Sequence, residues 1–247
     1  MHNLFDLSGK IVLVTGASSG IGREIAISAS AHGAEVIITG RNEARLAETK
    51  QMTNKITTIL PADLTNDADI KALVKQLPDL DGVVFCAGVG DYTPLKFINN
   101  EKIRHIFSVN FDSQVILTQQ LVKNKKIKKG GSLVYISSIS SKIGVPATAI
   151  YAASKAAINA FVKITASEVS GLKIRANSIC PGLIKTQMLE NAKDIVSAET
   201  ISESEKEYLL GLGSPVDVAG PALFLLSDAS KWITGTEMIV DGGLTVR

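Results

Sequence analysis

The sequence predicts an α/β fold, a single-domain Rossmann-like doubly wound parallel sheet with helices on both faces. Short runs rich in Val, Ile and Leu alternate with helical patterns along the 247 residues, and parallel strands buried on both faces have this composition. The first run leads into a glycine-rich turn that opens a helix, as in dinucleotide-binding units. No linker or repeat interrupts the order, so we expect one domain over residues 1–247, with a cofactor half at about 8–130 and a catalytic and substrate half at about 131–247.

The composition excludes several classes of protein. Apolar residues make up 45% and charged residues 20%, which is typical of a globular protein with ample core. No run approaches the roughly 18 to 20 apolar residues that cross a bilayer, and the start lacks a secretory signal, so we expect a cytoplasmic protein without a membrane partner. Aromatic residues are only 5%, too few for the stacking platforms of a nucleic-acid binder. Cys86, Cys180 and the three scattered histidines show no metal-ligand spacing, so we expect no metal.

Residues 10–15 (KIVLVT) predict a buried strand, and a turn with the spacing G-x3-G-x-G follows it before a helix. Glycines let a backbone approach a ligand closely, and the amides and dipole at a helix N-terminus favour a phosphate. We interpret the turn as a cofactor-binding loop; tight packing without a ligand is the alternative. The candidate cofactor contacts are Gly16, Ser18, Ser19, Gly20, Ile21 and Gly22.

Residues 35–39 (EVIIT) predict the second strand, which is followed by Gly40 and Arg41. In such units an acidic residue after this strand binds the 2′-hydroxyl of the adenosine ribose. A guanidinium there suits a 2′-phosphate instead, so Arg41 favours NADP(H) over NAD(H). Two alternatives remain: Glu43 takes the acidic role rather than carrying a favourable first-turn helix charge, or Arg41 is a solvated surface charge.

The third predicted strand, at 55–60, ends before Asp63 and Leu64, where an adenine would lie. Asp63 serves equally well as a cap for the turn before a helix at 67–76. The fourth strand, at 81–86, turns away through small residues that let the backbone run close to a cofactor ribose. The candidate cofactor contacts in these two turns are Asp63, Leu64, Cys86, Ala87 and Gly88.

A long helical zone at 97–122 carries Asn110 in its middle, among apolar residues. A buried Asn needs hydrogen-bond partners, and a structural water is one of them. The basic run KNKKIKK at 123–129 closes this helix. We interpret it as solvated helix-end charge, with a docking patch for an anionic partner as the alternative.

The fifth strand, at 131–138, delivers Ser138 to the carboxyl edge of the sheet, where doubly wound sheets place their sites. An Ala-rich helix follows, with Tyr151 and Lys155 four residues apart and therefore on one face. A neighbouring ammonium lowers the pKa of a phenol, so the pair predicts a tuned acid/base. A half-buried Tyr beside a solvated Lys is the alternative.

A sixth strand at 172–179 leads to the turn at 180–188, which brings Thr186 near the same edge. Residues 189–212 lack a firm pattern and predict a mobile lid. Pro215 opens a further helix, and a last strand lies at 236–240. We expect substrate specificity to lie in residues 90–98, 140–150 and 187–212.

Taken in order, these pieces resemble the short-chain dehydrogenase/reductase family along essentially the full length. The matching motifs are TGASSGIG at 15–22, Ala87-Gly88, Asn110, Ser138, YAASK at 151–155, Pro181-Gly182 with Thr186, and WITGTEMIVDGG at 232–243. The resemblance implies that Tyr151 is the general acid/base and that Lys155 lowers its pKa and holds the nicotinamide ribose. It also implies that Ser138 polarises the substrate carbonyl and that Asn110 carries a water linking Lys155 to a proton relay. The implied cofactor contacts are Tyr151, Lys155, Pro181, Gly182, Ile184 and Thr186.

Within the family the sequence looks closest to the 3-oxoacyl-acyl carrier protein reductases. It departs from them in having Phe85-Cys86 before Ala87-Gly88, where two asparagines are usual, and in a neutral Ser18-Ser19 pair. We therefore expect an NADP(H)-dependent oxidoreductase of ketones and secondary alcohols. We expect the substrate to be a 3-oxoacyl thioester, with a steroid, a sugar or another small ketone as the alternative. A non-catalytic NADP-binding sensor is the alternative from another class. The resemblance implies a homotetramer, and an acyl carrier protein would meet the lysines of the basic run at 123–129.

Overall fold

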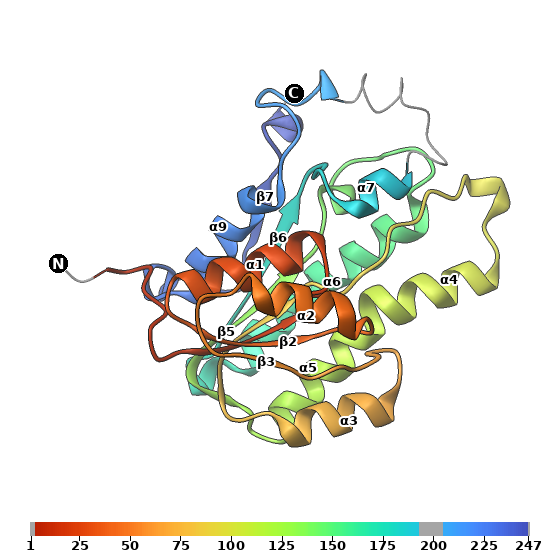
Figure 1. The fold of residues 1–247 in the computed structure, drawn as a ribbon. Coiled ribbons are helices and arrows are strands. Elements are labelled where there is room, and N and C mark those ends of the chain that lie inside the picture. The colour runs from red at the N-terminus through yellow and green to blue at the C-terminus, as the bar shows by residue number, and fades with distance from the viewer. Residues whose placement is uncertain (1–2, 193–204, 247) are drawn as a thin grey trace.

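Seven parallel strands form one sheet in the computed structural model, which describes residues 3–192 and 205–246 (Figure 1). The strand order is β3-β2-β1-β4-β5-β6-β7, so the chain winds outward from β1 to β3 and then returns to β4 beside β1. Ligands bind outside the carboxyl ends of strands at such a reversal. The predicted fold class is confirmed. The strands are β1 (Ile11–Thr15), β2 (Glu35–Thr39), β3 (Thr57–Ile59), β4 (Leu80–Phe85), β5 (Ile127–Ile136), β6 (Arg175–Pro181) and β7 (Glu237–Val240).

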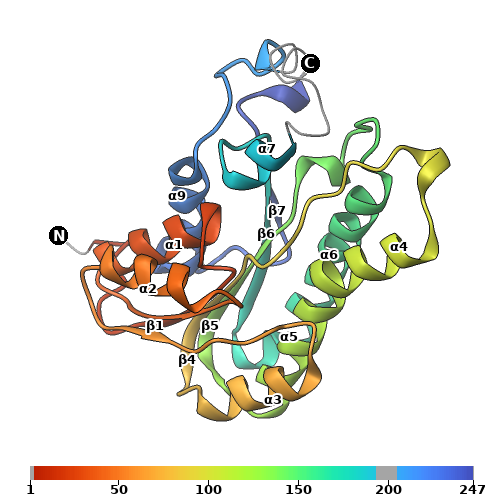
Figure 2. The same ribbon diagram turned by 45° about the vertical axis from the view of Figure 1, so that its right-hand side comes forward.

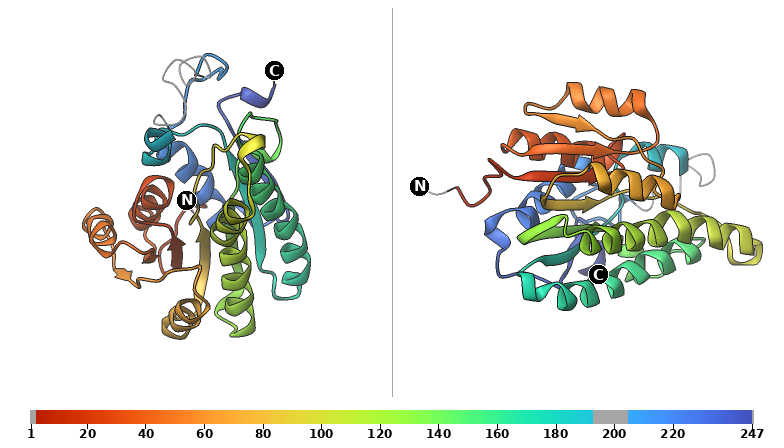
Figure 3. Two further views of the ribbon diagram at one scale, coloured as in Figure 1. Left: turned by 90° about the vertical axis from the view of Figure 1, so that its right-hand side faces the viewer. Right: turned by 90° about the horizontal axis from the view of Figure 1, so that it is seen from below.

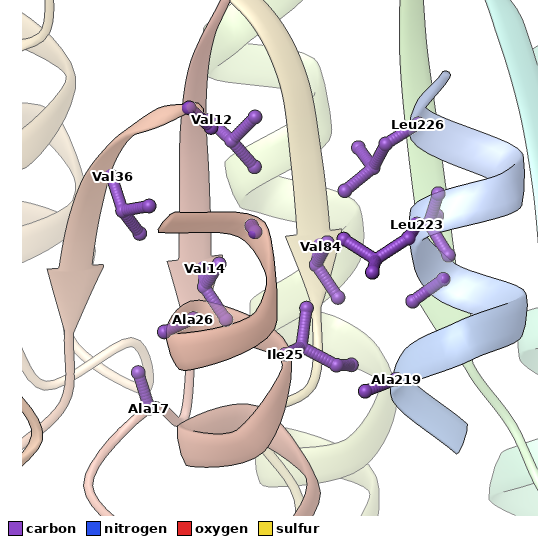
Figure 4. Packing of buried hydrophobic residues seen from close by; sticks show 14 of the residues in the cluster. Val12, Val14, Ala17, Ile25, Ala26, Val36, Val84, Ala219, Leu223 and Leu226 are labelled. Atoms are coloured by element: carbon purple, nitrogen blue, oxygen red, sulfur yellow. The ribbon is translucent and has the colours of Figure 1, made fainter. Parts of the chain in front are cut away.

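Helices cover both faces of the sheet (Figure 3). One apolar cluster joins the sheet to α1, α2 and α9, and a second joins its other face to α3, α5 and α6. Figure 4 shows the first cluster, where Val14 and Val84 of the sheet pack near Ile25 of α1 and Leu223 of α9. The helices are α1 (Gly20–Ala31), α2 (Glu43–Gln51), α3 (Asp67–Gln76), α4 (Asn100–Phe107), α5 (Ser113–Lys123), α6 (Ala149–Glu168), α7 (Gln187–Ala192) and α9 (Pro215–Leu226).

Side-chain caps fix where several helices begin. The Asn42 side chain accepts a hydrogen bond from Arg45 N at the start of α2, and the Asn66 side chain accepts from Ala68 N and Asp69 N at the start of α3. These bonds satisfy amides that have no partner inside the helix. Among the described residues, no helix is both long enough and apolar enough to span a bilayer.

The helical zone predicted at 97–122 is divided by a π-helical turn, Ser108–Asp112, between α4 and α5. The turn carries Asn110, whose side chain bonds both backbone groups of Val89. A π turn admits an extra residue into a helix and is frequent at functional sites. The contact between Asn110 and the loop after β4 is thus accommodated without a break between α4 and α5.

The basic run at 123–129 does not simply close a helix, because β5 already begins at Ile127. Ile127 pairs with Leu80, Lys128 forms an ion pair of 2.8 Å with Asp81, and Lys126 donates to Leu77 O. The ten residues of β5, at about 3.3 Å each, place this run roughly 30 Å from the strand's carboxyl end. A carrier protein bound there would therefore face the opposite edge of the sheet from Ser138.

The predicted lid at 189–212 is described only in part. Its first residues belong to α7, residues 193–204 lie outside the described part of the chain, and residues 205–213 pack near the C-terminal turn. There Leu210 N donates to Gly242 O at 3.0 Å. Figure 2 shows α7 and the C-terminus at the same end of the molecule.

Candidate active site

A cavity of about 750 Å³ opens at the carboxyl edge of the sheet. It is lined by all of the predicted site residues except Asn110. These are Gly16, Ser18, Ser19, Gly20, Ile21, Gly22, Arg41, Asp63, Leu64, Cys86, Ala87, Gly88, Ser138, Tyr151, Lys155, Pro181, Gly182, Ile184 and Thr186. The fold thus brings the ends of six strands, β1 to β6, and the start of α6 to one place.

The glycine-rich turn is packed directly against the end of β4. A Cβ on Gly16, which has φ +65°, would lie 2.8 Å from backbone atoms of Ala87, and one on Gly22 would lie 2.4 Å from Gly16 O. Thr15 Oγ1 accepts hydrogen bonds from Cys86 N and Ala87 N at 3.0 and 3.1 Å. Tight packing therefore accounts for Gly16 and Gly22, and it leaves backbone rather than side chains facing the cavity.

The ends of β2 and β3 form one side of the cavity. Asp63 Oδ1 accepts from Thr65 N and Thr65 Oγ1 at 3.0 and 2.7 Å. Hydrogen bonds from Thr65 hold the pKa of Asp63 below its ordinary value; burial opposes them, and the Arg41 guanidinium adds a smaller lowering. Asp63 thus orders its turn and lines the cavity, whereas Asn66 caps α3. Arg41 is exposed at the rim, and Glu43 is an exposed first-turn residue of α2.

Ser138, Tyr151 and Lys155 meet on the far side of the cavity from Arg41's strand. Ser138 follows β5 and caps the 3-10 turn Ile139–Ser141 by accepting from Ser140 N at 3.1 Å. Tyr151 and Lys155 come from the first two turns of α6, and Lys155 Nζ lies 5.8 Å from the centroid of the Tyr151 ring. Lys155 is only 4% exposed, so the alternative of a solvated lysine is wrong.

Burial dominates the electrostatics of this pair. It raises the pKa of Tyr151 to about 12, against the opposing effect of a hydrogen bond with the Ser138 side chain. It lowers the pKa of Lys155 to about 8, although the nearby thiols of Cys86 and Cys180 oppose the shift. The prediction of a lowered phenol pKa was therefore wrong for this state of the protein. Withdrawal from water outweighs the hydrogen bond with Ser138, and Tyr151 carries its proton at neutral pH.

Asn110 lies behind the cavity rather than in its wall. It is fully buried, with Oδ1 accepting from Val89 N at 2.8 Å and Nδ2 donating to Val89 O at 2.9 Å and to Ser154 Oγ at 3.2 Å. The prediction that the buried Asn110 side chain has hydrogen-bond partners is confirmed. Its partners are protein groups that fix the loop after β4.

The three segments predicted to determine substrate specificity, residues 90–98, 140–150 and 187–212, each contribute residues to the cavity lining. Tyr208 lies against Gly182, where a Cβ would come within 2.8 Å of its ring, and its hydroxyl accepts from Leu183 N at 2.9 Å. No local pattern marks a single tyrosine in an irregular segment. An apolar wall joins it, formed by Val89, Ile139, Ile143, Val145, Pro146, Leu183, Met188 and Leu189.

Within residues 3–192 and 205–246, no group of three or more His, Cys, Asp or Glu side chains is placed to hold a metal ion. Burial raises the pKa of the Cys86 thiol to about 12, so this residue is a neutral thiol in the cavity wall. The chemistry of the site rests on a hydroxyl, a phenol and an ammonium.

Comparison with known proteins gives concordant matches over nearly the whole chain. A family model described as enoyl-(acyl carrier protein) reductase matches residues 16–245. The 3-oxoacyl-[acyl-carrier-protein] reductase FabG of Rickettsia bellii is 34% identical over 241 residues, covering 98% of this chain and 99% of the relative. The L-rhamnose-1-dehydrogenase of Scheffersomyces stipitis is 34% identical over 258 residues, with 98% of each chain covered.

Among solved structures, a proposed NAD(P)-dependent gluconate 5-dehydrogenase from Beutenbergia cavernae superposes with a TM-score of 0.90. It is 29% identical, the match covers 99% of this chain and all of that one, and its crystal holds NADP at low occupancy. The relatives share an architecture and differ in the substrates that their names give.

Proposed function

The chain belongs to the short-chain dehydrogenase/reductase family, whose members are oxidoreductases of alcohol and ketone groups, and from this premise we propose that it reduces the ketone of a 3-oxoacyl thioester with NADPH. The observation that carries the substrate class is the apolar wall beside Tyr151. A polyhydroxy sugar needs several placed hydrogen-bond partners, and apolar side chains would leave its hydroxyls unpaired. An acyl chain is instead stabilised by burial against them.

The cavity fits a nicotinamide dinucleotide. Its volume of about 750 Å³ lies within the roughly 300–1,000 Å³ of ligand sites. The backbone of the glycine turn and the N-terminus of α1 would hold the diphosphate. Arg41 at the rim would pair with the 2′-phosphate, and Thr186, whose Cγ2 lies 3.3 Å from the position of a Cβ on Gly20, would meet the carboxamide. The bound cofactor supplies the hydride.

The proton that the ketone oxygen receives comes from residues of the chain itself. Tyr151 is protonated at neutral pH because burial raises its pKa to about 12, which suits a donor to a ketone oxygen that gains negative charge. Ser138, which bonds the phenol, would bond the same oxygen and orient the carbonyl. Lys155 brings positive charge to the buried pair and so stabilises the phenolate left after proton transfer.

The exposed apolar residues of two elements support subunit contacts, as in the homotetramer that the family resemblance implies. Ile164 on α6 is 60% exposed and Ile239 on β7 is 45% exposed in the single chain. These are the elements through which the family resemblance predicts subunit contacts. Light scattering at micromolar concentration tests the assembly, and a monomeric or dimeric mass contradicts the tetramer.

The function is tested by following NADPH absorbance in the presence of the 3-oxobutanoyl thioester of N-acetylcysteamine, with Tyr151→Phe as the matched variant. We expect turnover by the wild-type protein and a loss of at least about 100-fold in the variant. L-rhamnose with NADP+ or NAD+ serves as the second substrate class, because a rhamnose dehydrogenase is also a relative. Oxidation of rhamnose without turnover of the thioester overturns the substrate class. Cofactor binding without turnover of either substrate favours a sensor.

A further inference from the structure

Tyr92 lies at the border between two neighbouring cavities. It lines the cavity that holds Tyr151, and it also lines a neighbouring hollow of about 650 Å³. Its ring and the thioether of Met188 both lie 3.5 Å from the position that a Cβ on Gly90 would take. Tyr92, in the loop after β4, thus lies near the start of α7 and lines both cavities.

The hydroxyl of Tyr92 is uncommitted within the described residues. Its side chain is partly buried, yet none of the hydrogen bonds formed in residues 3–192 and 205–246 involves its Oη. Tyr208 provides the contrast, because its Oη already accepts from Leu183 N. A half-buried phenol without a partner in an apolar wall is a donor available to a ligand.

Tyr92 and Tyr151 are close enough to influence each other electrostatically. Both residues line the one cavity, and after burial and Ser138 the charge of Tyr92 is among the influences on the pKa of Tyr151. A substrate whose ketone oxygen is bonded by Tyr151 and Ser138 has room within this cavity to extend toward Tyr92. In a 3-oxoacyl thioester the next oxygen along the chain is the thioester carbonyl, which is an acceptor.

We propose that Tyr92 is a substrate-binding residue that donates a hydrogen bond from Oη to the thioester carbonyl, so that the site selects 1,3-dicarbonyl substrates over simple ketones. The part of the substrate beyond the sulfur continues into the second hollow, between Phe97 and Lys102. There Lys102 Nζ donates to Thr93 Oγ1 at 2.9 Å. This inference rests on the proposed function and names the thioester carbonyl as the feature of the substrate that the site recognises.

The test compares Tyr92→Phe with the wild-type protein on two ligands that differ in one group. The first is the 3-oxobutanoyl thioester of N-acetylcysteamine, and the second has a methylene in place of its thioester carbonyl. KM and kcat are measured with NADPH, and Kd is measured by calorimetry in the presence of NADP+, which permits no reduction. Tyr208→Phe is the matched control, because its hydroxyl is bonded to the backbone at Leu183.

We expect Tyr92→Phe to raise KM and Kd for the thioester by roughly 3- to 10-fold, the effect of one hydrogen bond. The same change should alter the values for the simple ketone less than about 2-fold. Tyr208→Phe should affect both ligands alike. Equal effects of Tyr92→Phe on the two ligands, or no effect on either, overturn the role of Tyr92.

The two proposals fail separately. If the wild-type protein binds the thioester but does not reduce it, the proposed function falls, while the Kd values still decide whether Tyr92 reads the second carbonyl. A selective loss of thioester affinity in Tyr92→Phe then supports the binding role alone. If the wild-type protein binds neither ligand, both proposals are overturned.

Discussion

Lys155 Nζ donates a hydrogen bond of 2.9 Å to the main-chain carbonyl of Ile136, the last residue of β5. The lysine that faces Tyr151 is thus tied to the strand that delivers Ser138, two residues further on. Because this ammonium is buried, its charge is costly, and its pKa falls to about 8. The protein keeps a charged group here whose protonation changes just above neutral pH.

The pH dependence of reduction should follow Lys155. Tyr151 keeps its proton up to a pKa of about 12, whereas Lys155 loses its charge as the pH rises through about 8. We expect kcat/KM for ketone reduction to be level between pH 6 and 7.5 and to fall above pH 8 with the slope of a single proton. Steady-state rates with NADPH across pH 6 to 10 provide the measurement. A level profile to pH 9.5 would show that this charge is not needed.

Removing the buried charge should stabilise the fold while abolishing turnover. Burial lowers the folded-state pKa of Lys155 from 10.5 to about 8, so the charged form costs roughly 3 kcal/mol below pH 8. The lost bond to Ile136 offsets about 1 kcal/mol. We expect Lys155→Met to raise the free energy of unfolding at pH 7 by about 2 kcal/mol.

The sign of this effect can be checked with pH. Between pH 8 and 10.5 the wild-type lysine is neutral when folded and charged when unfolded, so wild-type stability rises and the advantage of Lys155→Met shrinks. Urea unfolding at pH 7 and pH 10 measures both values, and Lys71→Met, on the exposed side of α3, is the control. A variant less stable than the wild type at pH 7 contradicts the prediction.

Arg41 should discriminate between the two cofactors. A charge-assisted hydrogen bond to a 2′-phosphate contributes roughly 1.5–3 kcal/mol. Arg41→Gln should therefore raise KM for NADPH by about 10- to 100-fold and change KM for NADH by less than about 2-fold. The exposed Arg45 on α2 supplies the control substitution. Equal losses with both cofactors would mean that Arg41 does not read the 2′ position.

Gly16 should tolerate no side chain. Alanine there combines a φ of +65° with a contact of 2.8 Å to the Ala87 backbone, and strain and overpacking together cost roughly 2–5 kcal/mol. Gly9 has a φ of +75° and open space around it, so Gly9→Ala should cost only about 1–2 kcal/mol. Thermal unfolding of the two variants separates packing from strain. Similar losses in both would rule out the close approach as the cause.

The sequence was informative where structure depends on local pattern. The strand at 35–39 and the helix at 67–76 lie within the bounds expected from periodicity and turn residues. The sequence was less informative where a contact between residues far apart in the chain determines the local structure. The π turn at Ser108–Asp112 depends on Val89, and the early start of β5 depends on the pairing of Ile127 with Leu80.

The same distinction applies to the site. Nearly every residue that the motifs indicated lines the cavity, because most of these motifs follow predicted strands. The degree of burial cannot be read from spacing, and it reverses the expected direction of the Tyr151 pKa. Tyr92 and Tyr208 lie in irregular segments where no periodicity marks a residue, so only the folded chain shows that they reach the cavity.

The π turn between α4 and α5 also constrains how this part of the chain can change in length. Each residue of an α-helix advances the side chains by about 100°, and the turn at Ser108–Asp112 holds one residue more than an α-helical turn. Deleting one residue there would restore a regular helix but rotate every position on one side of it. Either Asn110 would lose Val89, or Leu117 and Leu121 would leave the core. Among relatives that keep both contacts, we expect this segment to vary in sequence but not in length.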